Sequence, residues 1–392
     1  SSCRAVSVIP SSELLRGATA ASEWLDEEPS RERWQDWRVQ LRHAIRSVAE
    51  LEQYFELTPE ERAGAELAAQ QGLPIQITPY YASLCDKRDP DCPIRRQVVP
   101  RGCEGIETPG DMADPLGEEA HEVTEGLIQR YPDRVLLLVS DHCAVYCRFC
   151  TRSRMVGAGK GPLGVAARDR AIEYIARTPA IRDVILSGGD PLTLSTERLC
   201  NLLTRLRAID HVDTVRIATR LPVTLPMRIT DELLSALRPF HPLWVMTHFN
   251  HPKELTSEAI DACERMADAG FPVMNQTVLL AGINDDADVL ESLFRGLVRA
   301  RVRPYYLLQM DPVRGTAHLR TPLSRGIAII EQLQGRLSGI ALPKLIVDTP
   351  GGMGKVPVGP DYVVSRRGGS TRLRTHRGVE VDYVDPPAGD SA

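Results

Sequence analysis

The sequence lacks a long apolar run, an excess of positive charge and a secretory pattern in its first residues. No stretch of the 392 residues approaches the length of apolar chain that crosses a bilayer. The opening residues, SSCRAVSVIPSSELLRG, have no basic region followed by an apolar one, so we expect a cytoplasmic protein. The formal net charge of -5 gives no general attraction to nucleic acid or to anionic membranes. We therefore expect a small molecule as the partner.

The sequence also lacks an even, closely spaced set of cysteines. Its nine cysteines are an odd number spread over a long chain, which argues against a disulfide framework. Free thiols or metal ligands are the alternatives. We expect Cys85, Cys92 and Cys103 to be free, because a second metal cluster would need a tighter grouping.

Residues 1–76 are predicted to form an N-terminal helical segment. Apolar residues recur every three or four positions from Trp34 to Phe55, and Thr58 with Glu61 three residues later has the pattern of a capping box that begins a second helix. Residues 77–126 are rich in Pro, Gly, Asp and Cys and show little periodicity. We expect them to form an irregular segment that wraps on a neighbour and contributes to function.

Residues 127–343 alternate short β-rich runs with helical stretches, which predicts βα repeats around a parallel sheet. Polar residues collect where each run ends, and these ends share one mouth in a parallel barrel. The runs are RVLLLVS, DVILSGG, TVRIATR, LWVMTHFN, PVMNQTVLL and VRPYYLLQM, with KLIVDTPGG as a seventh. We predict an α/β fold with a partial (β/α)6 barrel, its gap covered by the N-terminal segment or the tail. Residues 344–392 form a C-terminal extension with a poorly ordered end.

Three cysteines, Cys143, Cys147 and Cys150, follow the first of these runs at C-x3-C-x2-C spacing, without a fourth nearby. A structural zinc site needs four protein ligands, which this segment does not supply. An electron-transfer [4Fe-4S] centre normally has four cysteines as well. Besides these two, a third interpretation is a cluster with three irons held by protein and one iron left open for a ligand.

This spacing, with the aromatic Phe149 before the last cysteine, resembles the radical S-adenosylmethionine superfamily. That resemblance implies a partial barrel, and a cluster whose open iron binds S-adenosylmethionine and cleaves it to a hydrogen-abstracting radical. The stretch SGGD resembles the superfamily's glycine-rich strand, although two glycines at a strand end are more often only a turn. Contacts to S-adenosylmethionine are then expected from Phe149, Ser187, Gly188, Gly189, Asp190, His248 and Gln276.

A narrower resemblance covers the chain from about Trp34 to about Tyr383. The stretches ITPYYASL, DPLGEE, RYPDRVLLLVSDHCAVYCRFCTR, THFNHPKELT, RVRPYYLLQMD and VDTPGGMGK are similar to lysine 2,3-aminomutase and its relatives, in order and spacing. The resemblance implies pyridoxal 5'-phosphate bound as a Schiff base to Lys355 in a glycine-rich turn. Arg130, Arg134 and Tyr131 are candidates for holding the same cofactor, with surface solvation as the alternative for the arginines.

The same family correspondence assigns three residues to the substrate. Arg152 would hold its carboxylate, since a planar guanidinium suits a bidentate clamp, and Asp311 and Asp348 would hold a cationic side chain. Two carboxylates disfavour a glutamate mutase. We predict a 2,3-aminomutase that converts L-lysine to β-lysine, with an arginine 2,3-aminomutase as the alternative. A non-catalytic iron-sulfur or zinc-binding module is the alternative from a different class.

One family feature is missing. The clostridial-type enzymes carry a zinc site made by cysteines of a C-terminal cluster and one of the barrel, but the tail VEVDYVDPPAGDSA has no cysteine and the barrel position is Asp286. We therefore expect no zinc, and a homodimer or a higher homo-oligomer. A low-potential electron donor is required, and the sequence does not identify it.

Overall fold

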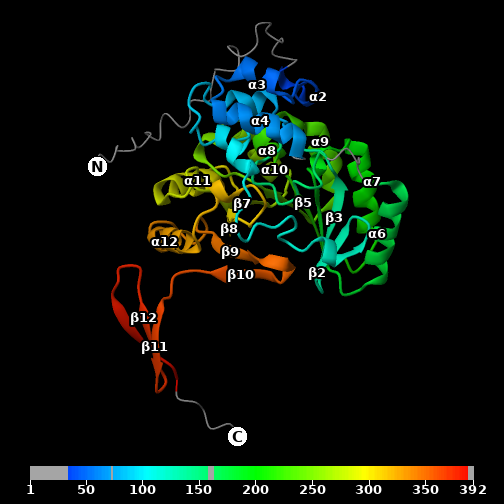
Figure 1. The fold of residues 1–392 in the computed structure, drawn as a ribbon. Helices are drawn as coiled ribbons and strands as arrows, with labels where there is room; N and C mark the ends of the chain where they lie inside the picture. The colour runs from blue at the N-terminus through cyan, green and yellow to red at the C-terminus, as the bar shows by residue number, and fades with distance from the viewer. Residues whose placement is uncertain (1–33, 72–73, 158–162, 387–392) are drawn as a thin grey trace.

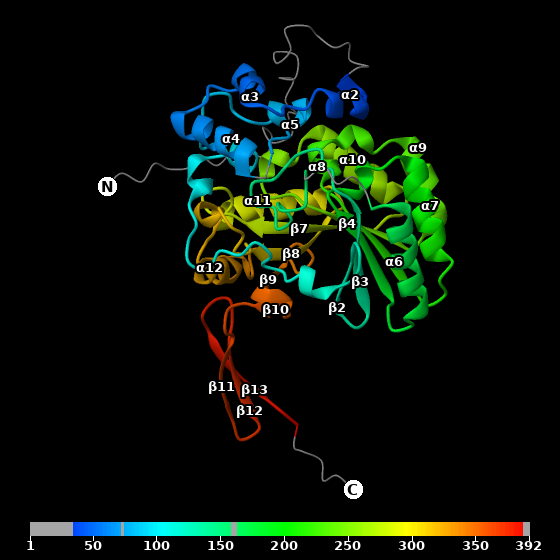
Figure 2. The same cartoon turned by 45° about the vertical axis from the view of Figure 1, so that its right-hand side comes forward.

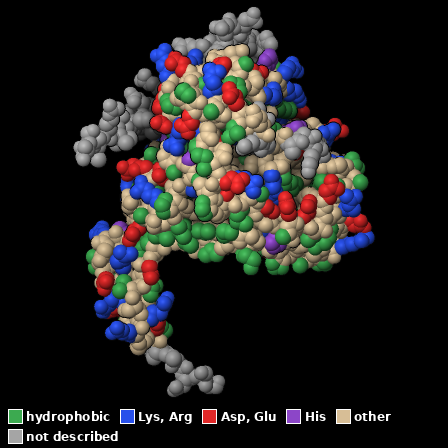
Figure 3. Space-filling model, in the orientation of Figure 1, with side chains coloured by type: hydrophobic (Ala, Val, Ile, Leu, Met, Phe, Trp, Pro, Cys, Tyr) green, Lys and Arg blue, Asp and Glu red, His purple; other side chains and the backbone are tan. Residues whose placement is uncertain are grey.

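The computed structural model describes residues 34–71, 74–157 and 163–386, and the statements below concern these ranges (Figure 1). A curved sheet lies at the centre, a group of short helices caps one end, and a small second sheet projects from the other (Figures 1 and 2). On the face shown in Figure 3, basic and acidic side chains are interspersed. That mixture agrees with the small net charge of the chain.

The main sheet has ten strands, which lie in the same order as along the chain. The seven strands from β3 to β9 run parallel, whereas the flanking β1, β2 and β10 pair antiparallel with their neighbours. The strands are β1 Glu122–Thr124, β2 Leu127–Tyr131, β3 Arg134–Ser140, β4 Asp183–Gly188, β5 Thr214–Ala218, β6 Leu243–Thr247, β7 Val273–Leu279, β8 Arg303–Gln309, β9 Lys344–Thr349 and β10 Gly354–Val358. The seven predicted runs are thus confirmed as β3 to β9. The sheet stays open between β1 and β10, as a partial barrel requires.

Helices follow the parallel strands and cover the outer face of the sheet (Figure 2). They are α6 Val165–Arg177, α7 Thr196–Arg207, α8 Leu221–Thr224, α9 Asp231–Leu237, α10 Ser257–Asp268, α11 Ala287–Arg299 and α12 Leu323–Leu333. The spacing of Leu290, Leu293, Phe294 and Leu297 in α11 shows why: these fully buried residues make one apolar stripe that packs on the sheet. No helix in the described ranges is long and apolar enough to cross a membrane.

Asp286, where the related enzymes were expected to carry a zinc ligand, has a different contact here. It is the N-cap of α11, and its side chain accepts hydrogen bonds from the backbone N–H groups of Asp288 and Val289. An aspartate satisfies the exposed donors of a helix N-terminus and suits its positive end.

The N-terminal cap contains α2 Trp37–Arg42, α3 Val48–Tyr54, α4 Pro59–Gln71 and α5 Pro79–Ser83. The prediction of one continuous helix from Trp34 to Phe55 was therefore wrong, because this stretch forms two helices, α2 and α3. Ile45 leaves the helix to exchange backbone hydrogen bonds with Ile77, at 2.8 and 3.1 Å, and Ser47 starts α3 with a capping box to Glu50. The predicted capping box of Thr58 and Glu61 is confirmed by reciprocal hydrogen bonds of 2.9 and 3.2 Å.

Short 3-10 turns complete the fold. They are η2 Arg95–Gln97, η3 Gly102–Gly105, η4 Glu119–His121, η5 Pro191–Thr193, η6 Pro226–Arg228, η7 Arg238–Phe240, η8 Pro252–Glu254, η9 Ala317–Leu319 and η10 Pro350–Gly352. The segment that leads into η4 lies against the turn after β9, where Gly351 N–H donates to Pro115 C=O at 3.0 Å. The open side of the sheet is thus bordered by the irregular segment, and not by the N-terminal helices or the tail as expected.

The tail instead forms a separate antiparallel sheet of β11 Val363–Arg367, β12 Ser370–Arg374 and β13 Glu380–Val384. This sheet projects away from the body (Figures 1 and 2). Its strands hydrogen-bond with one another and not with the main sheet, whereas the first strands of the predicted extension 344–392, β9 and β10, belong to the main sheet. The last residues, expected to be poorly ordered, lie outside the described residues from 387 onward.

Candidate active site

The loop after β3 carries the three cysteines and packs directly on the glycine-rich end of β4. Gly189 N–H donates to Ser140 C=O at 2.5 Å, and Asp190 N–H donates to His142 C=O at 2.7 Å. A Cβ at Gly188 would overlap the Ser140 carbonyl, and one at Gly189 would overlap that of His142. Gly188 also has a φ of +118°, a region that residues with a Cβ rarely adopt. The glycine pair thus sets the height of the cysteine loop above the sheet.

Ser187 and Asp190 are both buried beside this contact. The Asp190 carboxylate accepts hydrogen bonds from Leu192 N–H at 3.0 Å, from the Thr219 hydroxyl at 2.7 Å and from Arg220 N–H at 2.7 Å. Burial raises the pKa of Asp190 to about 6, against these hydrogen bonds, which lower it. The predicted cofactor contact is therefore already engaged in fixing the turns after β4 and β5.

The three thiols are free and lie close enough to influence one another. Burial raises the pKa of Cys150 to about 11, with Cys147 as the next cause. Burial, Asp190 and the other two cysteines raise the pKa of Cys143 well above its ordinary value. Three thiolates could therefore coexist here only beside compensating positive charge, which a metal cluster supplies. No group of His, Cys, Asp or Glu in the described ranges is arranged as a ready site for a metal ion.

Phe149 and His248 lie next to the loop. Phe149 is buried with Leu280, Ile283, Met310 and Leu319. Its ring centroid is 5.6 Å from that of His248, whose Nε2 lies 3.0 Å from the Asn250 amide oxygen. Burial and the nearby Arg220 guanidinium lower the pKa of His248 to about 3, so its imidazole is neutral. Gln276 is half-buried on β7, where its backbone pairs with Tyr306.

A second group of predicted residues meets where β2 faces β9 and β10. Lys355 forms an ion pair with Asp348, and its backbone N–H donates to the Tyr131 hydroxyl at 2.8 Å. Arg130 donates from Nη2 to the other Asp348 oxygen at 3.1 Å. Arg134 stacks on the Tyr131 ring with its guanidinium carbon 3.9 Å from the centroid. Residues more than 200 positions apart are thus brought together across the open side of the sheet.

Asp311 follows β8 and belongs to the same group. Burial and the neighbouring Asp348 raise the pKa of its carboxyl to about 7, while Lys355 and Arg130 oppose the shift. Two carboxylates so close cannot both be ionised at low cost without a cation between or beside them. The pair is therefore suited to hold a further positive charge.

Arg152, at the end of the cysteine loop, is held by a residue that the sequence analysis did not single out. Its Nε and Nη2 both donate to the Glu118 carboxylate, at 3.0 and 2.6 Å, and its Nη1 donates to the Ser187 hydroxyl at 3.3 Å. The Glu118 side chain is only 5% exposed. Glu118 belongs to the quoted stretch DPLGEE, so two adjacent acids in a family motif were the signal that could have identified it.

Arg220 was also missed as a site residue, although it ends the quoted run TVRIATR, and polar residues were expected to collect at the ends of these runs. It follows β5, and its Nη1 donates to the Cys147 sulfur at 2.6 Å. Only the folding of β3 and β5 into one sheet brings an arginine 73 positions away onto a cysteine of the loop.

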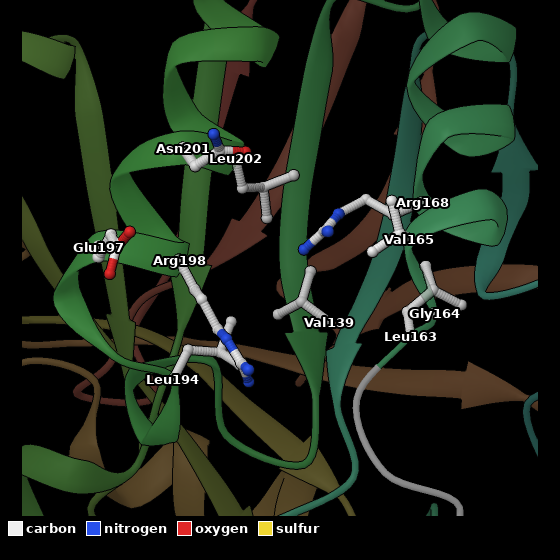
Figure 4. Close-up of a pocket in the computed structure, with 10 residues that line it drawn as sticks. All are labelled: Val139, Leu163, Gly164, Val165, Arg168, Leu194, Glu197, Arg198, Asn201 and Leu202. Carbon is white, nitrogen blue, oxygen red and sulfur yellow. The ribbon is translucent and has the colours of Figure 1, made fainter.

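Cavities in the described ranges lie away from Lys355 and the residues around it. One of about 460 Å³ is on the outer side of the sheet between α6 and α7, where Arg168 and Arg198 line it with Val139 and Leu202 (Figure 4). None of the predicted site residues lines this cavity. A second, of about 580 Å³, lies beside the cysteine loop and is lined in part by Met112, Arg148 and Arg154.

An open parallel βα sheet with three cysteines after its first parallel strand, packed on a glycine pair of the next, defines a radical S-adenosylmethionine enzyme. Residues 137–293 match the family model of the radical SAM superfamily, and residues 330–390 match the model described as lysine-2,3-aminomutase. The chain is 49% identical to the L-lysine 2,3-aminomutase of Acetoanaerobium sticklandii over 91% of this chain and 86% of that one. It therefore belongs to the lysine 2,3-aminomutase family.

Further relatives agree with this membership. The chain is 49% identical to the L-lysine 2,3-aminomutase of Fusobacterium nucleatum, over 91% of this chain and 83% of that one. It is 41% identical to the glutamate 2,3-aminomutase of Clostridioides difficile, over 92% and 85%. The chain is thus an isomerase of the aminomutase type, whose cofactors are a [4Fe-4S] cluster, S-adenosylmethionine and pyridoxal 5'-phosphate.

Proposed function

We propose that this protein converts L-lysine to β-lysine by moving the α-amino group to the neighbouring carbon. The observation that carries the proposal is the half-buried Asp311 next to the buried Asp348 beside Lys355, because two carboxylates suit a substrate with a cationic side chain. A glutamate side chain would meet repulsion at the same place.

Each cofactor has residues of matching chemistry. Cys143, Cys147 and Cys150 would hold the cluster, and Lys355 would bind the aldehyde of pyridoxal phosphate. Arg130, Tyr131 and Arg134 would hold its phosphate, as arginine forks and a hydroxyl donate well to phosphate oxygens. When bound, these groups supply a radical that removes a hydrogen atom from the substrate and a π-system that accommodates the migrating nitrogen.

The chain's own residues orient the substrate. Asp311 and Asp348 would attract the side-chain ammonium at one end, and Arg152 would bind the carboxylate at the other. Glu118 accepts from Nε and Nη2 of Arg152 and Ser187 accepts from Nη1, which leaves the second N–H of each Nη atom for the substrate. A substrate held at both ends presents a fixed carbon to the cysteine loop, and such positioning is a large part of catalysis.

The test is an assay of the anaerobically reconstituted protein with dithionite, pyridoxal phosphate and S-adenosylmethionine. L-lysine, L-arginine and L-glutamate are supplied separately, and β-amino products are measured by mass spectrometry. We expect β-lysine from lysine. Turnover of arginine alone would establish the arginine alternative, and a formed cluster without any product would establish a non-catalytic module.

The assignment of Lys355 is tested by its alanine variant. Lys355→Ala should lose the visible absorbance of lysine-bound pyridoxal phosphate while keeping its iron. Lys344→Ala is the matched control, since Lys344 is an exposed lysine on β9. A wild-type spectrum of the Lys355 variant would refute the assignment.

We also propose a homodimer or a higher homo-oligomer and a low-potential electron donor for the cluster. The reaction would take place in the cytoplasm, because the three cysteines must stay reduced to bind iron and the cytoplasm maintains thiols in that state. Light scattering of the reconstituted protein measures its oligomeric state. A monodisperse monomer at working concentration would contradict it.

A further inference from the structure

Arg220 occupies a buried position against the cysteine loop. Its Nη1 donates to the Cys147 sulfur at 2.6 Å, and its Nε donates to the His248 carbonyl at 3.2 Å. Its guanidinium carbon lies 5.5 Å from the centroid of the Phe149 ring. Every one of these partners belongs to the cysteine loop or to the loop after β6, so Arg220 joins the two.

The other end of the guanidinium is held by the loop after β6 and by the N-terminal part of the chain. Nη2 donates to Glu254 at 2.8 Å, to the Gln97 amide oxygen at 2.6 Å and to the Tyr81 hydroxyl at 3.1 Å. Gln97 in turn accepts the Arg148 backbone N–H at 2.9 Å through its carbonyl. The irregular segment thus fixes the arginine and the cysteine loop together.

Glu254 makes this arrangement rigid. Its side chain is fully buried, and it also accepts from the Tyr81 hydroxyl at 2.7 Å and from the backbone N–H groups of Asn250 and His251 at 2.5 and 2.9 Å. A buried carboxylate with this many donors has little freedom, and its partner arginine is confined with it. The carboxylate of Glu254 offsets the charge of Arg220 on its Nη2 side. The Nη1 side of the guanidinium faces the Cys147 sulfur.

We propose that Arg220 is a positioning residue that fixes Cys147 as a cluster ligand and raises the reduction potential of the cluster. The proposal rests on the assignment of the three cysteines as cluster ligands. Reduction adds one electron from a low-potential donor and moves no proton, so the reduced cluster is more negative by one charge. A cationic hydrogen-bond donor on a coordinating sulfur stabilises that charge, and hydrogen bonds to sulfur are among the factors that set cluster potentials.

The test is a redox titration of the reconstituted clusters, monitored by electron paramagnetic resonance, without lysine or pyridoxal phosphate. Arg220→Gln removes the charge, and Arg220→Lys keeps a charge that cannot reach the sulfur and Glu254 at once. We expect Arg220→Gln to have about a tenfold lower ratio of reduced to oxidised cluster at a fixed poise, which is 59 mV for one electron. Arg220→Lys should shift in the same direction by less.

Arg95→Lys is the matched control, because Arg95 is another fully buried arginine, paired with Glu61 at 2.7 Å, and none of its hydrogen-bond partners in the described ranges is a cysteine. Its cluster should titrate at the wild-type potential. Folded Arg220 variants that lose iron while Arg95→Lys retains it would support the positioning role. Full iron content with an unchanged potential in both Arg220 variants would overturn the proposal.

If neither Arg220 variant folds, the reduction potential of the cluster in Glu254→Gln tests the proposal instead. Removal of the offsetting negative charge should shift the potential in the positive direction, and an unchanged potential there would overturn the proposal. Because these titrations contain no substrate, their result does not depend on which amino acid the enzyme rearranges. A protein inactive on lysine could still show the predicted shifts.

Discussion

Burial and the neighbouring Asp348 carboxylate both raise the pKa of the Asp311 carboxyl. The pKa of about 7 means that this carboxyl is largely protonated at mildly acidic pH, when Lys355, Arg130, Asp348 and Glu118 are the charged groups around it. A cationic substrate side chain would favour the ionised carboxylate and release the proton. The affinity for lysine should therefore depend on pH in a range where lysine itself keeps its charge.

We expect kcat/KM for lysine to rise up to tenfold per pH unit below about pH 7 and to level off above it, since one proton is released on binding. The measurement is the initial rate between pH 6 and pH 8 at low lysine concentration. Asp311→Asn should remove this dependence and reduce kcat/KM by about 10–100-fold, the loss of a hydrogen bond to a charged group. Asp261→Asn, a substitution on exposed α10 surface, is the control. If kcat/KM of Asp311→Asn still rises with pH below about 7, the titrating group is not Asp311.

The contact of Glu118 with Arg152 leads to a second prediction about a single residue. Glu118→Gln leaves Arg152 without its buried carboxylate and should raise the KM for lysine by about tenfold, the order of one charged hydrogen bond. The kcat and the visible spectrum of bound pyridoxal phosphate should change little. Glu119→Gln is the control, because Glu119 is the next residue but is largely exposed and pairs with Arg154. An equal effect of the two substitutions would show that Glu118 has no special role.

At the scale of elements, the sequence predicts the parts that depend on local periodicity. The runs that became β3 to β9 show β-rich composition, and the capping box of Thr58 with Glu61 is a local signal, so both were found. The break between α2 and α3 was not, because it depends on a backbone pairing of Ile45 with Ile77 that no local pattern reveals. Long-range contacts also place the irregular segment at the open side of the sheet.

The contact between β4 and the cysteine loop gives a prediction at this scale. Gly189→Ala places a methyl group against the backbone of His142, which cannot yield as a flexible side chain could. We expect the loop to shift and the reconstituted protein to lose most of its cluster, measured as iron per chain. Gly339→Ala is the control, since a Cβ there meets no atom within 4 Å. Full iron content in Gly189→Ala would show that the loop tolerates a larger spacing.

For the whole molecule, the open α/β architecture and the grouping of the site residues were predictable in different ways. The alternation of runs and helices indicates the sheet. The meeting of Arg130 and Tyr131 with Asp348 and Lys355 was expected only from family resemblance, because it requires the two edges of the sheet to approach each other. The roles of Glu118 and Arg220 were not predicted from the sequence for the same physical reason, because each contacts a residue more than 30 positions away.

The projecting sheet of β11 to β13 was not predicted, and its contacts with the body are few. Arg374 pairs with Glu331 at 3.0 Å between half-exposed side chains, and His376 lies against Gly335. Exposed ion pairs contribute about 0–1 kcal/mol to stability, so the body should not depend on this sheet. Nothing in the cysteine loop or around Lys355 bonds to it in the described ranges.

We therefore expect a chain that ends at Gly359 to fold with its catalytic groups intact. Its midpoint of thermal unfolding, followed by circular dichroism, should fall by no more than about 1–2 °C, the shift that 1 kcal/mol produces when unfolding gains about 2.1 cal/mol/K per residue over roughly 360 residues. Iron content and the absorbance of bound pyridoxal phosphate should equal those of the full chain. Arg374→Ala in the full chain isolates the single ion pair and should account for most of any shift. Loss of the cooperative transition or of either cofactor would show that the projecting sheet supports the body through contacts that form only on assembly.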